Sequence, residues 1–262
     1  MDVRQRPLAC KQSLLPEMLA ERFNFRDLGV YRTADGRRLR PGLVFRSGSL
    51  SGMADAELQQ FATFGITRVF DLRSSVERVR SPSNHGVSTW VCEHEESNAD
   101  LEGLWRAQGM DRQRAVSLMT DLYRDLPEEH AEAFGVVYAH IADQGSPMLF
   151  HCAAGKDRAG VCAALLLDLL EVPRATIEQD YMATSKTSAR AIVETRDSME
   201  RLGIKFVEPS AIEPILNPEP SYISAMFDAV EQRYGSTQSY AEQRMGFGKA
   251  KLDAMRAKLI QD

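Results

Sequence analysis

Residues 147–170 read PMLFHCAAGKDRAGVCAALLLDLL, and this stretch decides the fold. The apolar run Pro147–Phe150 predicts a short buried strand, and Val161–Leu170 predicts a helix that is apolar on all sides. The polar loop between them therefore opens at the carboxyl end of a buried strand. Ligands bind at that end of the strands in open α/β sheets. We expect the functional site in this loop.

The segments on either side alternate between helical and extended patterns. Leu58, Phe61 and Phe64 recur at helical spacing before Gly65, and Ile66–Leu72 then predicts a buried strand. We expect edge strands at Gly29–Thr33 and Arg37–Arg40, on either side of a hairpin turn at residues 34–36, and at Leu43–Arg46. A short strand is expected at Ser88–Cys92, and helices at Arg112–Arg124 and Glu128–Asp143. Residues 174–262 are expected to form a series of short helices.

The length and composition of the chain fit one core. The 262 residues are 44% apolar, and no repeat or Pro/Gly/Ser-rich linker marks a second domain. We expect an N-terminal extension over residues 1–22 and a single domain over 23–262, with a helical cover from about 174 to 262. The fold class predicted is α/β, with a central sheet flanked by helices and additional C-terminal helices.

The charge and cysteine content exclude several classes of protein. A net charge of −5 gives no general attraction for nucleic acid, and no apolar run approaches the roughly 20 residues that span a bilayer. The four cysteines form no CxxC pair, and no His/Cys cluster suggests a metal. We expect a cytoplasmic protein without an integral membrane segment or a cofactor, although secretion without a signal peptide would leave no trace. The oligomeric state is open.

The loop itself predicts nucleophilic chemistry on phosphate. A free cysteine has a pKa near 8.5, so a useful thiolate needs stabilisation. Cys152 stands where a helix N-terminus presents unpaired N–H groups, and Arg158 adds a full positive charge. The same arrangement binds a phosphate dianion, because the N–H groups of a tight loop converge on one point and the Arg158 fork can hold two oxygens. Gly155 permits the curl.

The pattern of His, Cys, five residues and Arg resembles the signature of protein tyrosine and dual-specificity phosphatases. The longer form, which runs from His151 to Gly160 and contains Gly-Lys-Asp-Arg, resembles bacterial tyrosine and phosphoinositide phosphatases of the PtpB/LipA type. Three other segments are similar to motifs of that family: Asn24-Phe25-Arg26-Asp27-Leu28-Gly29, Phe45-Arg46-Ser47-Gly48, and Asp71-Leu72-Arg73-Ser74 with Glu77.

The resemblance implies a protein tyrosine phosphatase-like fold and a two-step reaction. Cys152 would attack phosphorus to form a cysteinyl phosphate, Arg158 would stabilise charge, and Asp157 would protonate the leaving group. Asp71, Glu95, Glu96 and Asp100 are rival acids, because other branches of the superfamily bring the acid in on a separate loop. The residues expected to bind substrate are His151, Ala153, Ala154, Gly155, Lys156, Ala159 and Asp71.

The substrate class stays open between phosphorylated protein and phosphoinositide. Lipid phosphatases of the superfamily often carry lysine at the position of Lys156, which meets a second phosphate, but Ala153 stands where the best-known of them has another lysine. Ala159 is a second departure from the family pattern. Most relatives have Thr or Ser at this position, and the hydroxyl of that residue donates to the cysteine sulfur. A catalytically weak phosphate-binding module and a rhodanese-type sulfurtransferase are the alternatives, although the sulfurtransferase loop is shorter.

Several residues near the loop also have structural interpretations. Cys162, on the predicted helix, is expected in the core. His151 is expected to order the loop by hydrogen bonding. Asp71, Arg73 and Glu77 either line the site or form a set of ion pairs after the strand.

Overall fold

The fold is built on one central sheet. The computed structural model describes residues 17–92, 111–186 and 209–261. Its five-stranded sheet has the order β1-β3-β6-β4-β5, with β1 antiparallel to its neighbour and the other pairs parallel. The strands are β1 (Arg26–Asp27), β3 (Val44–Ser47), β4 (Arg68–Asp71), β5 (Thr89–Val91) and β6 (Met148–His151). The predicted mixture of sheet and flanking helices is confirmed.

Strand register brings the sequence motifs to one edge of the sheet. His151, the last residue of β6, pairs with Ser47 of β3 on one side and with Asp71 of β4 on the other. The carboxyl ends of three parallel strands therefore finish at the same level. Cys152 follows β6 at that level, so the loop opens between the other two motifs.

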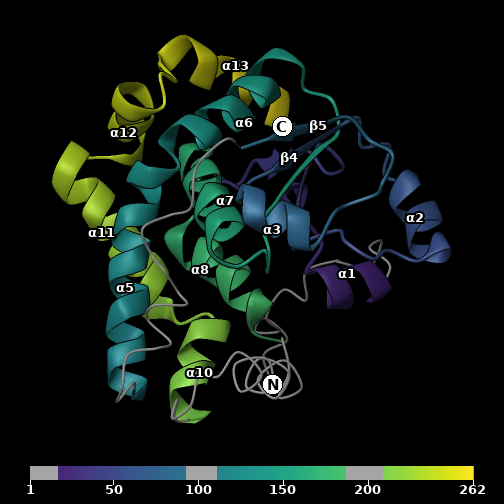
Figure 1. Ribbon diagram of the computed structural model, residues 1–262. Coiled ribbons are helices and arrows are strands. Elements are labelled where there is room, and N and C mark those ends of the chain that lie inside the picture. The colour runs from purple at the N-terminus through teal and green to yellow at the C-terminus, as the bar shows by residue number, and fades with distance from the viewer. Residues whose placement is uncertain (1–16, 93–110, 187–208, 262) are drawn as a thin grey trace, which may run out of the picture.

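Helices cover both faces of the sheet. Successive side chains of β6 point to opposite faces, and apolar side chains lie on each face, so both faces need a cover. Met148 and Phe150 pack into the larger core, whereas Leu149 packs into the smaller core on the opposite face. The smaller core includes α1 (Glu17–Phe23) and α2 (Asp55–Ala62), which lie on the right in Figure 1. The larger core includes helices drawn on the left and in the centre: α5 (Arg112–Glu129), α6 (Ala131–Asp143), α7 (Arg158–Leu169), α8 (Arg174–Met182) and α11 (Pro220–Tyr234).

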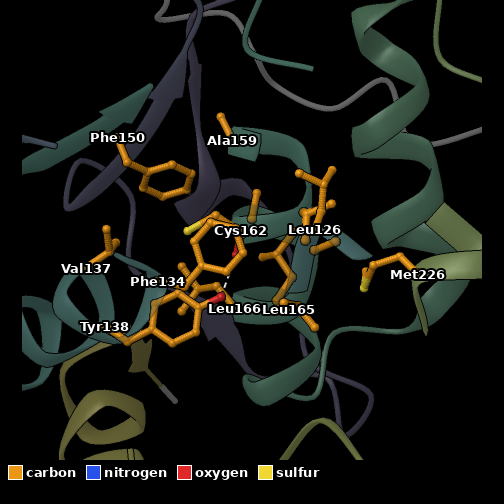
Figure 2. Packing of buried hydrophobic residues seen from close by; sticks show 14 of the residues in the cluster. Leu126, Phe134, Val137, Tyr138, Phe150, Ala159, Cys162, Leu165, Leu166 and Met226 are labelled. Atoms are coloured by element: carbon orange, nitrogen blue, oxygen red, sulfur yellow. Dashed lines mark hydrogen bonds between the residues drawn. The ribbon is translucent and has the colours of Figure 1, made fainter. Parts of the chain in front are cut away.

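Helix α7 runs through the middle of the larger core. Figure 2 shows Cys162 among Phe134, Tyr138 and other apolar side chains, and the Tyr138 hydroxyl donates to the Cys162 carbonyl at 2.7 Å. Cys162 is fully buried, so its predicted place in the core is confirmed. Burial raises the pKa of this thiol well above its ordinary value.

The remaining elements complete the C-terminal part and a small side sheet. Helices α10, α11, α12 and α13 run through this part in green to yellow in Figure 1, and α5 packs against α10 and α11. The elements not yet placed are α3, two short 3₁₀ turns and the two strands of the side sheet. The bounds are α3 (Ser75–Arg80), α10 (Pro209–Leu216), α12 (Thr237–Arg244), α13 (Lys249–Leu259), η1 (Leu28–Val30), η2 (Ala183–Lys186), β2 (Arg38–Leu39) and β7 (Ile260–Gln261).

The structure corrects two expectations about the strands. The strand predicted at Leu43–Arg46 is not an edge strand, because β3 lies between β1 and β6 and all four of its residues are buried. The C-terminal part is not only helical, since β7 pairs antiparallel with β2. Helix α1 contains residues on both sides of the border expected after residue 22, and its Leu19 is buried. Within the described ranges, no helix is long and apolar enough to cross a bilayer.

Candidate active site

The candidate site is the turn from β6 into α7. Cys152 follows the last residue of β6, and α7 begins six residues later at Arg158, so the loop curls tightly at a helix N-terminus. Gly155 has a φ of +75°, and a Cβ there would lie 2.6 Å from the Gly48 nitrogen. The curl therefore requires glycine both for its backbone angle and for its close approach to β3. Cys152 is buried, with 1% of its surface exposed.

Three successive carbonyls of the loop are held on its outer side. The Ala153 carbonyl accepts from the Ser49 N–H at 2.8 Å, the Ala154 carbonyl from Asn24 Nδ2 at 3.2 Å, and the Gly155 carbonyl from Arg46 Nη2 at 2.6 Å. All three donors belong to the segments of the two N-terminal motifs or follow them directly. The carbonyls are therefore anchored by elements distant in sequence.

Outward carbonyls determine where the N–H groups of the loop face. In a trans peptide the N–H points opposite to the preceding C=O, so these three peptides turn their N–H groups to the inner side. In the part of the chain that the structure describes, no N–H of residues 153–157 donates to another protein group. Unpaired N–H donors at the positive end of a helix are an arrangement that attracts anions.

Arg158 is fixed by Glu77 at the start of α7. Its Nη1 and Nη2 each donate to one Glu77 oxygen at 2.6 Å, and Nη1 also lies 3.2 Å from the Leu72 carbonyl. Three of the five guanidinium N–H groups are thus used, which leaves one on Nη2 and the one on Nε for a ligand. Burial disfavours the charged forms of both Glu77 and Arg158, but their contact outweighs the effect of burial. The pKa of Glu77 is therefore lowered and the pKa of Arg158 is raised.

Asp157 lies between the loop and α5. The Tyr123 hydroxyl donates to Asp157 Oδ1 at 2.8 Å, and the Tyr181 hydroxyl donates to Tyr123 at 2.7 Å. The Asp157 side chain makes no hydrogen bond to the start of α7 and is 27% exposed. A carboxyl held by neighbours at one oxygen and open to solvent has the arrangement needed for proton transfer to a bound ester.

Lys156 does not project into the anion site. Only 1% of its surface is exposed, its Nζ donates to the carbonyl of Ile215 in α10, and it lies 3.2 Å from Asp157 Oδ1. The ammonium group therefore links the loop to the C-terminal helices. This contact could not be predicted from a local pattern, because Ile215 is 59 residues away in the chain.

Asp71 and Arg73 form a buried ion pair beside the loop. Arg73 Nη2 lies 2.7 Å from Asp71 Oδ2, and both side chains are at most 4% exposed. Burial opposes ionisation of Asp71, but hydrogen bonds from Arg73 outweigh it and hold its pKa below the usual value. These contacts support the ion-pair interpretation of this pair. The prediction that Asp71 binds substrate gains no support from them.

His151 supports the loop from within the sheet. It is fully buried, and its Nδ1 lies 3.2 Å from the Cys152 carbonyl. Burial lowers the pKa of His151 to about 4, against the opposing effect of Asp71 3.7 Å away, so the ring is neutral at pH 7. A neutral ring suits the predicted role in hydrogen bonding better than a role as an acid.

Other candidates are separated from the loop or cannot be located. Asp27 accepts from the N–H groups of Gly29 and Gly42, so it shapes a turn. Glu95, Glu96 and Asp100, the rival acids, lie outside the described residues. Among the described residues, no three His, Cys, Asp or Glu side chains converge as a metal site requires. The sequence did not indicate Tyr123, Tyr181 or Asp180, which are ordinary helix positions in it.

The chain is similar to known tyrosine phosphatases along most of its length. A family model described as the tyrosine phosphatase family matches residues 18–261. The chain is 33% identical to a candidate tyrosine-protein phosphatase of Cupriavidus necator over 87% of this chain and 84% of that protein. It is 29% identical to the triple specificity protein phosphatase PtpB of Mycobacterium tuberculosis, over 91% and 96% respectively. A tyrosine-protein phosphatase of Nostoc commune is 27% identical over 82% and 74%.

Proposed function

This chain belongs to the tyrosine phosphatase family and is a cysteine-dependent phosphatase, and we propose that it acts on phosphotyrosine and related single phosphate monoesters, with the loop 151–159 as its site. The observation that carries the proposal is the position of Cys152 at the entrance to α7, inside a loop whose N–H groups face inward and whose arginine is fixed by Glu77. We further propose a cytoplasmic location, where a reducing environment keeps the Cys152 thiol free.

The reaction proceeds in two displacements. The Cys152 thiolate attacks phosphorus in line, the ester oxygen leaves with a proton from Asp157, and a cysteinyl phosphate remains. Water, deprotonated by the Asp157 carboxylate, then attacks phosphorus and regenerates the thiolate. The loop N–H groups and the two remaining Arg158 N–H groups hold the three equatorial oxygens in both steps.

The contacts of Lys156 favour single phosphates over multiply phosphorylated lipids. A second phosphate would need a free ammonium group at the mouth of the loop, and that of Lys156 donates to the Ile215 carbonyl instead. Breaking this buried contact would cost part of the binding energy that a lipid headgroup offers. Phosphoinositides are therefore the second candidate substrate.

A substrate panel tests this assignment. We expect hydrolysis of para-nitrophenyl phosphate and a phosphotyrosine peptide, with kcat/KM on the peptide about tenfold or more above that on phosphoinositides. The variant Lys156→Met keeps the length of the side chain and should leave the ratio of peptide to lipid activity unchanged. A natural enzyme that prefers phosphoinositides, with a Met variant that loses the preference, contradicts the assignment.

The first prediction concerns the acid: Asp157→Asn should slow substrates with poor leaving groups far more than those with good ones. General acid catalysis contributes about 10²- to 10⁴-fold. We expect about a hundredfold loss in kcat on phenyl phosphate and less than about tenfold on para-nitrophenyl phosphate, because a good leaving group departs without the proton. Steady-state kinetics on the two esters measure this.

Tyr123→Phe is a second variant that tests the same acid. It keeps the ring in the core but removes the hydroxyl that donates to Asp157. If this bond orients the acid, the same preference for good leaving groups should appear at a few-fold level. Equal losses on both esters in Asp157→Asn would assign the acid elsewhere, with Glu95, Glu96 and Asp100 next in line.

The second prediction concerns breakdown of the phosphoenzyme, which Ala159 should slow. Ala159 is fully buried and has no hydroxyl for the Cys152 sulfur. A hydrogen bond to a charged group contributes about 1.5 to 3 kcal/mol, which corresponds to roughly ten- to a hundredfold in the rate at which thiolate leaves. We expect a pre-steady-state burst with para-nitrophenyl phosphate, measured by rapid mixing.

Ala159→Thr should diminish the burst and raise kcat, whereas Ala159→Val should not. Valine matches threonine in shape, so it reproduces any strain from filling the core without supplying the hydroxyl. A natural enzyme without a burst, or a Val variant that behaves as the Thr variant, would disprove the role of the missing hydroxyl. A catalytically weak phosphate-binding module, the alternative considered from the sequence, would also turn over slowly.

A further inference from the structure

A buried ion pair reaches the candidate site from behind. Arg46, at the third position of β3, is fully buried, and its Nη1 donates to Asp180 of α8 at 2.5 Å. The Asp180 side chain is 2% exposed and also accepts from the Tyr31 hydroxyl at 2.7 Å. Burying such a pair gains little stability over an apolar replacement, because both charges lose their water. Stability alone therefore does not explain this pair.

The other arm of Arg46 touches the loop. Nη2 donates to the Gly155 carbonyl at 2.6 Å, and a Cβ on Gly160 would lie 3.2 Å from the same nitrogen. The guanidinium therefore fits between the loop and the first turn of α7. Among the three donors to the outward carbonyls of the loop, Arg46 is the one that carries a charge and is fully buried.

The contact sets the direction of one peptide group. The Gly155 carbonyl and the Lys156 N–H belong to the same trans peptide and point in opposite directions. Gly155 adopts a left-handed φ and has no side chain to restrict rotation of this peptide. Without a donor behind the carbonyl, the peptide is free to turn its oxygen toward the bound anion, which would repel phosphate.

We propose that Arg46, held by Asp180, is a positioning residue that fixes the Gly155–Lys156 peptide with its N–H toward the phosphate. The inference rests on the proposed use of loop 151–159 as the anion site. Misplacing a reacting or binding group by about 1 Å costs on the order of a hundredfold in rate. The pair thus acts through the loop and touches no substrate atom.

Arg26 offers a matched control in the same cluster. It is also buried, its Nε lies 3.7 Å from Asp180, and it donates to the Asp180 carbonyl and to Thr184. Within the residues that the structure describes, Arg26 donates no hydrogen bond to the loop. A change at Arg26 therefore disturbs the same buried charges without removing a donor to the loop carbonyls.

The test compares Arg46→Lys with Arg26→Lys. Each variant keeps the buried positive charge for Asp180, so both should fold, but a single ammonium group cannot reproduce the two-armed contact of Arg46. We expect Arg46→Lys to weaken inhibition by inorganic phosphate and vanadate about tenfold and to lower kcat/KM on para-nitrophenyl phosphate about a hundredfold. Arg26→Lys should change both by less than about threefold.

Thermal unfolding of the two variants separates positioning from stability. We expect similar losses in Tm, since both disturb the same cluster, and an oxyanion defect in Arg46→Lys alone. Equal oxyanion defects at equal Tm would overturn the proposal, as would a normal phosphate affinity in a folded Arg46→Lys. If Arg46→Lys does not fold, Asp180→Asn, which keeps an oxygen for Arg46 but loses the charge, should weaken phosphate binding by more than about threefold, and an affinity unchanged within about threefold overturns the proposal. A natural protein that binds no phosphate would refute the anion site instead.

Discussion

Cys152→Ser is expected to abolish turnover of para-nitrophenyl phosphate while the protein continues to bind inorganic phosphate. A serine hydroxyl ionises far too weakly to replace a thiolate, and Asp157, which must be protonated to serve as the acid in the first step, is not available then as a base for the hydroxyl. His151 is buried, neutral and hydrogen-bonded to the backbone. The anion site survives, because it consists of backbone N–H groups and Arg158.

Two measurements check this result on the same variant. Steady-state hydrolysis should fall to the limit of detection, and calorimetric titration with phosphate should give an affinity within a few-fold of that of the natural protein. Cys162→Ser is the control, since this thiol is in the core on α7 and its loss should affect stability more than chemistry. Substantial hydrolysis by Cys152→Ser would refute Cys152 as the nucleophile. Loss of hydrolysis in Cys162→Ser alone would assign that role to Cys162.

The sequence predicted the layout of the fold because the deciding patterns are local. The apolar strand before His151 and the apolar helix after Gly160 are each encoded within a dozen residues, and both are confirmed with their junction at Arg158. The interior place of β3 was not predictable in the same way. Strand order depends on which strands pair across long separations, and Arg46 offers a polar side chain where a central strand normally has an apolar one.

The site was predicted in its backbone and missed in its supporting contacts. The spacing of Cys152 and Arg158 indicates a curled anion loop, but the side chains that hold the loop come from positions without a local pattern. Tyr123 and Asp180 look like ordinary residues of amphipathic helices, and they reach the loop only through tertiary packing. Lys156 is the opposite case. Its charge predicted a contact with a phosphate of the substrate, but its partner in the structure is a backbone carbonyl.

Arg158→Lys is expected to be the second most damaging change, with a loss of kcat/KM of about a hundredfold or more. Removing a single donor from a transition-state anion site typically costs about 10²- to 10³-fold. The guanidinium spends three N–H groups on Glu77 and Leu72 and keeps two for phosphate. An ammonium group at the same place has three donors around one atom, so it cannot face Glu77 and two phosphate oxygens together.

Glu77→Gln distinguishes the fork of Arg158 from its charge. The amide keeps one acceptor for Arg158 but loses the second acceptor and the negative charge, so the guanidinium should be held less firmly while its attraction for phosphate increases. We therefore expect Glu77→Gln to lower kcat about tenfold and to leave phosphate affinity unchanged or tighter, whereas Arg158→Lys should lower both. An Arg158→Lys enzyme within about threefold of the natural one would mean that charge alone suffices, and that the bidentate fit to the equatorial oxygens has no part in catalysis.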